Sequence, residues 1–98
     1  MVKINVHIQG IGGLRLNEQI IIDIGEERTV SDILRKIIKI KPELSDYIDK
    51  NLLRPKPGML LLINNIDYTI ISNTNIKEFV ETKTKKINVT IIPVNHGG

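Results

Sequence analysis

The chain has 98 residues, no cysteine and a formal net charge of +3, with 3% aromatic residues. This length fits a single domain, and the lack of cysteine excludes disulfides, a thiolate metal site and a cysteine nucleophile. The few aromatics and the small charge argue against direct nucleic-acid binding. Two histidines, His7 and His96, are too few and too far apart to suggest a metal site. No apolar run approaches the ~20 residues of a membrane span, so we expect a soluble, cytoplasmic protein with no membrane partner.

The first third of the chain predicts a hairpin followed by a helix. Residues 2–9 alternate between apolar and polar side chains, which is the pattern of a half-buried strand. The glycine-rich turn at 10–13 leads to a second predicted strand over 14–24. Its expected inward side chains are Leu14, Leu16, Ile20, Ile22 and Ile24.

An amphipathic helix is predicted next, with Thr29 as its N-cap and Asp32 at the third helical position. Pro42 ends this helix or begins a further turn. The apolar stripe that should lie on the sheet consists of Val30, Ile33, Leu34, Ile37 and Ile38. A weaker helical face could follow, formed by Leu44, Tyr47 and Ile48.

The second half predicts three more strands. Residues 54–58 form a rigid polar link, and 59–63 are a continuous apolar run, expected to be a strand covered on both faces. Asn64 and Asn65 suit a tight turn, after which 66–71 should pair back as a hairpin. A helical turn over 76–80 and an alternating strand over 86–92 complete the chain, and Pro93 ends the pairing.

This order favours an α+β fold in which one mixed sheet covers the main helix, with the last strand parallel to the first. We expect a domain over residues 1–93 and a flexible tail over 94–98. The tail ends in Gly97 and Gly98. Two glycines make a thread that can enter a channel too narrow for any Cβ, and its only reactive group is the Gly98 carboxylate. The alternative is a frayed end without a role.

The chain resembles the β-grasp family of ubiquitin-like proteins over its whole length. The specific parts are residues 57–65, with the sequence Pro-Gly-Met-Leu-Leu-Leu-Ile-Asn-Asn, the following Asp67, and the ending at 91–98. The His-Gly-Gly ending is similar to that of the branch that contains ubiquitin-related modifiers and sulfur carriers. The small subunit of molybdopterin synthase and the small archaeal modifier proteins lie near this branch.

The resemblance implies a β-grasp sheet of about five strands and a carrier rather than an enzyme. A partner adenylating enzyme would use ATP and Mg²⁺ to activate Gly98, and this chain would bind no cofactor itself. A persulfide from a sulfurtransferase would then give a thiocarboxylate for sulfur donation, for example to a tRNA uridine. Attack by a lysine amine of a target protein would instead give an isopeptide bond. Gly97 and His96 would be recognition residues of the tail, and we expect a monomer.

The strand patterns also predict a partner-docking patch. If Leu61 and Ile63 point to the helix, then Leu60 and Leu62 point away from it, as does Ile92 on the last strand. Ubiquitin-like proteins use this face beside the tail to bind activating enzymes. A different class of function, an adaptor that binds partners and is never activated, would make the tail dispensable. An enzyme is disfavoured because no nucleophile and base stand out as a pair.

Overall fold

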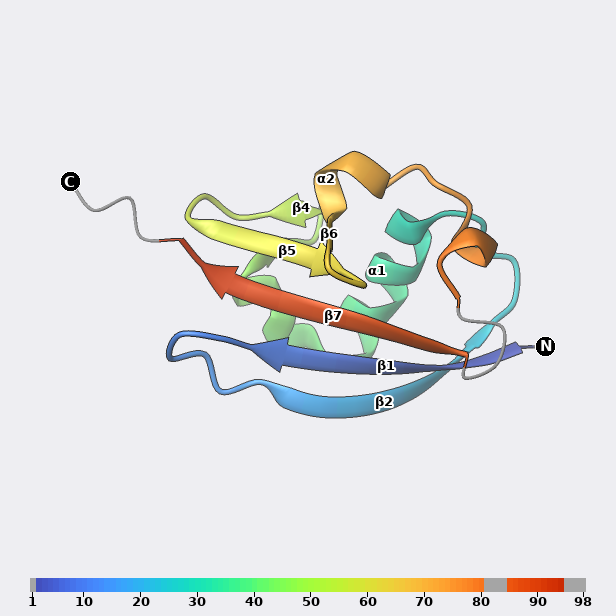
Figure 1. The fold of residues 1–98 in the computed structure, drawn as a ribbon, viewed down its shortest axis with the longest axis horizontal. Coiled ribbons are helices and arrows are strands. Elements are labelled where there is room, and N and C mark those ends of the chain that lie inside the picture. The colour runs from blue at the N-terminus through green and yellow to red at the C-terminus, as the bar shows by residue number, and fades with distance from the viewer. Residues whose placement is uncertain (1, 81–84, 95–98) are drawn as a thin grey trace.

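The computed structural model describes residues 2–80 and 85–94, and within them one mixed sheet packs against one main helix (Figure 1). The sheet has five strands in the order β2-β1-β7-β5-β6. This is the α+β fold expected from the sequence, in a β-grasp arrangement. The sheet strands are β1 (Val2–Gly10), β2 (Asn17–Ile24), β5 (Met59–Ile63), β6 (Ile66–Asp67) and β7 (Lys86–Pro93). The remaining elements are α1 (Val30–Ile40), the 3₁₀ helix η1 (Pro42–Asp46), β3 (Ile48–Asp49), β4 (Arg54–Pro55), α2 (Tyr68–Ile71) and the 3₁₀ helix η2 (Ile76–Glu78).

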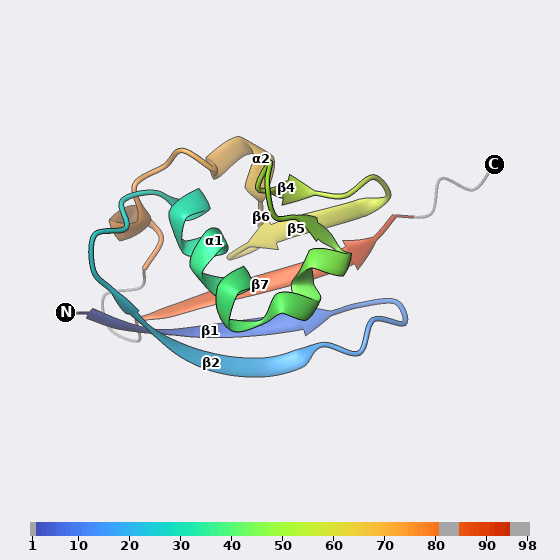
Figure 2. The ribbon, with the colours of Figure 1, turned by 180° about the vertical axis from the view of Figure 1, so that it is seen from behind.

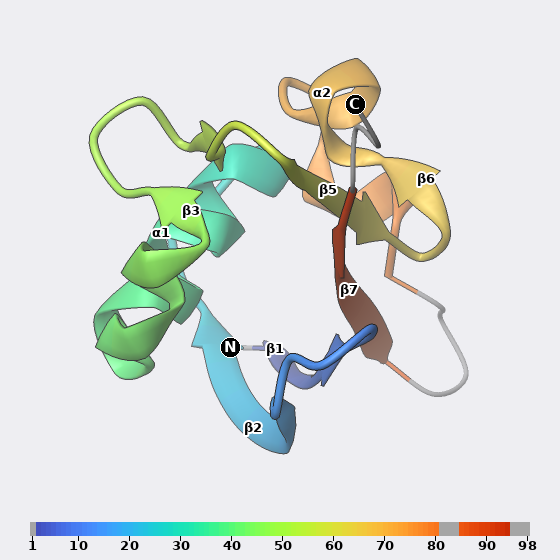
Figure 3. The ribbon, with the colours of Figure 1, turned by 90° about the vertical axis from the view of Figure 1, so that its left-hand side faces the viewer.

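The topology places the first and last strands side by side at the centre of the sheet. β1 forms an antiparallel hairpin with β2 and a parallel pair with β7, as predicted. β7 in turn pairs antiparallel with β5. Seen from the end at which β7 finishes, the sheet curves round α1 (Figure 3). None of the helices in the described segments is long and apolar enough to cross a membrane.

The helix α1 begins and packs as the sequence predicts. The Thr29 Oγ1 accepts the Asp32 N–H at 3.2 Å, and the Asp32 carboxylate accepts the Thr29 N–H at 3.1 Å, which completes a capping box. The whole predicted apolar stripe is buried. It packs against the inward side chains of the central strands, which are Ile4, Val6, Ile8, Leu61, Ile63, Ile87, Val89 and Ile91.

Four local predictions were wrong. β2 begins at Asn17 rather than at residue 14. Ile48 belongs to the two-residue strand β3, which pairs with β4, so residues 54–55 are more than a polar link. Only Ile66 and Asp67 pair back on β5, because the Asp67 carboxylate accepts the Thr69 N–H at 2.9 Å and caps α2.

The turns require unusual backbone at a few positions. Asn64 and Asn65 both adopt positive φ, at 50° and 67°, as expected for a tight two-residue connection between β5 and β6. Asn64 also ties this turn to the last strand, since its Oδ1 accepts the Asn88 N–H at 2.9 Å. The strand pair β5–β6 is thereby held against β7.

Candidate functional site

The end of β7 is fixed beside the start of β5. Leu60 lies opposite Ile92 and Met59 lies opposite Pro93 across the two strands. One residue further, the Val94 N–H donates to the Gly58 carbonyl oxygen at 2.7 Å. Pro93 was predicted to end the pairing, but it still pairs with Met59, so β7 runs one residue beyond the predicted 86–92. The hydrogen bond next to this pair comes from the Val94 N–H and does not require a donor on the proline. The predicted tail residues His96, Gly97 and Gly98 lie outside the described residues.

The face of the sheet opposite α1, here called the outer face, carries the predicted docking patch of Leu60, Leu62 and Ile92. Leu61 and Ile63 are buried against α1, whereas Leu60 and Leu62 are half-buried. On β7 the same alternation buries Ile91 and leaves Ile92 half-buried. The strand register assumed from the sequence is thus confirmed. Because only one face of β5 meets the helix, the prediction that both faces are covered was wrong.

The β1–β2 loop adds an apolar residue that the sequence reasoning missed. The Ile11 N–H donates to the Ile91 carbonyl oxygen at 3.1 Å, so this loop runs alongside the end of β7. A Cβ on Gly12 would lie 3.3 Å from the Pro93 Cγ, which shows how closely the loop approaches. Ile11 and Val94 are each 40% exposed. The sequence offered one indication of this residue, because an isoleucine is unusual in a glycine-rich turn.

One carboxylate borders the docking patch. Asp67 lies directly opposite Leu62 on the edge strand β6. Hydrogen bonds from the Thr69 side chain and backbone lower the pKa of Asp67 from its ordinary value, so the carboxylate is ionised at neutral pH. The patch is therefore apolar toward the tail end of the sheet and acidic toward β6.

Metal-binding chemistry has no support within residues 2–80 and 85–94, where no group of three His, Asp or Glu side chains is placed to hold an ion. What the arrangement offers is a half-buried apolar surface at the sheet end from which the last residues leave. Such a surface suits binding to another protein.

Comparison with known proteins supports the fold. No protein-family model matches the sequence, and no curated protein matches it. Among solved structures, the solution structure of the HVO 2177 protein of Haloferax volcanii is similar, with a TM-score of 0.54 and 16% sequence identity. The match covers 98% of this chain and 88% of that protein. At this identity the likeness concerns the fold alone, and it extends over nearly the whole chain.

Proposed function

We propose that this protein is a ubiquitin-like modifier and sulfur carrier that a partner enzyme activates at the Gly98 carboxylate. The observation that carries the proposal is the fixed end of β7, where Val94 is bonded to Gly58 beside the half-buried Leu60 and Ile92. Four residues follow Val94, and the last two are glycines. Fully extended, they would reach at most about 14 Å from the body of the domain.

The proposed reaction takes place in the partner. The Gly98 carboxylate would attack the α-phosphorus of ATP and release pyrophosphate, giving an acyl-adenylate whose AMP is a good leaving group. A persulfide sulfur would displace AMP, and a thiol would reduce the resulting acyl disulfide to the thiocarboxylate. A lysine amine could react with the activated acyl group instead and form an isopeptide bond.

The docking patch would hold the domain while the tail reaches the partner's nucleotide site. Complete burial of one such leucine or isoleucine contributes roughly 1.5–3 kcal/mol, and these side chains are only half-buried in the free domain. The short reach of the tail makes this docking necessary. A carboxylate on a thread of four residues can enter a narrow site only if the partner grips the adjacent surface.

The same patch would equally serve an adaptor that is never activated, so the experiment must separate the two functions. The protein is incubated with ATP, Mg²⁺ and an adenylating enzyme of the ubiquitin-activating type, and its intact mass is measured. We expect an AMP adduct and, when a sulfur donor is added, replacement of one oxygen by sulfur. Stable binding of the enzyme without any change in mass would favour the adaptor.

A further inference from the structure

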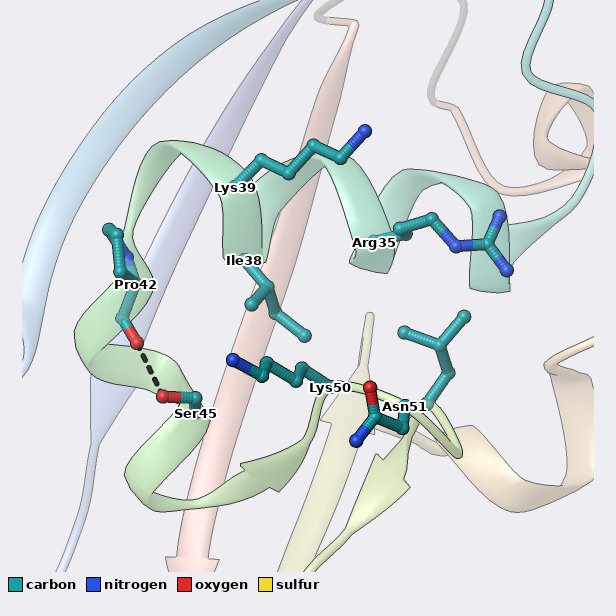
Figure 4. Close-up of a pocket in the computed structure, with 8 residues that line it drawn as sticks. Arg35, Ile38, Lys39, Pro42, Ser45, Lys50 and Asn51 are labelled. Carbon is teal, nitrogen blue, oxygen red and sulfur yellow. Dashed lines mark hydrogen bonds between the residues drawn. The ribbon is translucent and has the colours of Figure 1, made fainter.

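A basic groove lies on the helix side of the molecule, away from the docking patch. It is bounded by α1, η1 and the loop that joins β3 to β4 (Figure 4). Figure 2 shows the side of the sheet on which α1 lies. The volume of the groove is about 380 Å³, within the range of ~300–1,000 Å³ found for ligand pockets. The lining residues are Arg35, Ile38, Lys39, Pro42, Ser45, Lys50, Asn51 and Leu53.

Among the residues that the structure describes, those lining this groove include three cations and no carboxylate. Lys39 and Lys50 form no ion pair with another described residue, although nearby Lys36 is paired with Glu27 at 2.9 Å. Arg35 is 3.3 Å from Asp32, but the Arg35 side chain is exposed and Asp32 is only partly buried, so this pair is weak. Two lysines without a described ion partner, beside an arginine whose ion pair is weak, favour a negatively charged ligand.

The floor of the groove is apolar, and one of its residues lies in a loop with a strained backbone. Ile38, Pro42 and Leu53 supply it. Leu53 has a φ of 51°, a left-handed conformation that is uncommon for a leucine and costs about 1–3 kcal/mol. Its N–H donates to the Asp49 carbonyl oxygen at 2.8 Å, which helps to hold this conformation. Leu52, in the same loop, is 58% exposed.

The backbone N–H groups of the loop indicate which kind of anion the groove can bind. The Asp49 carboxylate accepts the N–H groups of Asn51 and Leu52, at 2.9 and 3.0 Å. With the Leu53 N–H also engaged, these three amides cannot cradle a phosphate as a backbone nest would. The polar side chains that line the groove are two lysines, one arginine, the Asn51 amide and Ser45, whose hydroxyl donates to the Pro42 carbonyl oxygen at 2.7 Å.

We propose that this groove binds an acidic peptide segment of a partner protein. An apolar side chain of that segment would lie on Ile38, Pro42 and Leu53, while flanking carboxylates would approach Lys39 and Lys50. Because the groove and the docking patch lie on opposite sides of the sheet, both can be occupied at once. The proposal does not depend on activation of Gly98.

The test uses the full chain labelled with ¹⁵N and an eight-residue peptide with two central leucines flanked by three glutamates on each side. We expect amide shifts at the groove, and binding that weakens as salt is raised. The double variant Lys39→Glu, Lys50→Glu should bind this peptide at least about tenfold more weakly, because two attractions become repulsions. The matched control is Lys77→Glu, an exposed lysine that does not line the groove.

Two further probes complete the test. Replacing the two leucines by serines, or the six glutamates by lysines, should remove most of the binding. Thermal unfolding of each protein variant shows whether it still folds. If the double variant does not fold, the single variant Lys50→Ala replaces it in the binding measurement. The proposal would be overturned if the shifts were confined to other surfaces or if the serine peptide bound with equal affinity. It would also be overturned if inorganic phosphate bound more strongly at the same residues, or if the Lys39 and Lys50 protein variants bound the peptide without loss.

Discussion

Val94 and Gly58 are joined by a backbone hydrogen bond of 2.7 Å, so the sheet holds the chain one residue beyond Pro93. If Gly98 carries the activated carboxylate, as proposed, its greatest distance from this bond is limited by the four residues that follow Val94. This relationship makes the length of the tail testable at the level of a single residue.

Deleting Gly98, or adding one alanine after it, should abolish adenylation and leave the fold unchanged. The carboxylate would then lie about 3.3–3.6 Å short of, or beyond, its required position. The measurement is the AMP adduct by intact mass, with thermal unfolding as the control for folding. An unchanged yield of adduct from the shortened protein would show that Gly98 is not the activated residue.

Replacing Gly97 by valine should block activation through the bulk of the new side chain. The buried core of the described segments runs from Ile4 to Ile91, and we expect no change in the free energy of unfolding. Single-turnover adenylation rates provide the measurement, and Gly97→Ala gives a graded comparison. Equal rates for the valine variant and the original protein would rule out a narrow channel in the partner.

Leu62→Ala should weaken binding of the adenylating enzyme by about tenfold or more, given that ~1.4 kcal/mol corresponds to a factor of ten. Its effect on stability should be smaller than that of Leu61→Ala, the neighbour that is buried against α1. For that buried leucine we expect a loss of ~2–5 kcal/mol. Calorimetric titration and denaturant unfolding measure the two effects. The patch has no role in docking if the Leu62 variant binds normally.

Asp32→Asn should lower stability at neutral pH by weakening the capping box. Backbone hydrogen bonds from Arg28 and Thr29 lower the pKa of Asp32 from its ordinary value of 3.8. A lowered folded-state pKa contributes stability that is present above the unfolded pKa and is lost as pH falls through the folded value. The difference in free energy of unfolding between the two proteins should therefore be largest near pH 7 and shrink below about pH 4.

The measurement for this prediction is urea unfolding at a series of pH values. Thr29→Ala, which removes the other half of the box, should cost about 1 kcal/mol at all of them. Comparing the two variants separates the ionised carboxylate from the neutral hydroxyl. A constant difference for Asp32→Asn across the acidic range would show that the charge of Asp32 does not stabilise the helix.

The sequence predicted best those features that neighbouring residues determine. The stripe from Val30 to Ile38 and the Thr29 cap both follow from helical spacing, and both are confirmed. The strand register assumed for Leu60 to Ile63 is also confirmed, since Leu61 and Ile63 are the buried pair. The position of Ile11 beside the end of β7 was not predicted, because it depends on the path of the β1–β2 loop.

Features set by distant contacts were not predictable. Residues 68–71 look like a strand, but Asp67 caps a helical turn and Tyr68 is only 1% exposed, so packing decides against extension. β3 and β4 are two residues each, too short to give a periodic signal. The positive φ of Leu53, which shapes the basic groove, has no sequence signature because leucine rarely adopts it.

The parallel pairing of β1 and β7 at the centre of the sheet has a mechanical consequence. β1 starts at one end of this pair, and β7 finishes at the other end. Tension applied between Val2 and Val94 would therefore load the hydrogen bonds of the pair in shear, all at once, rather than peel them apart in succession. When force is applied through those two ends, the β1–β7 pair should resist it. The rate of forced unfolding would then depend on how fast the hydrogen bonds of this pair break.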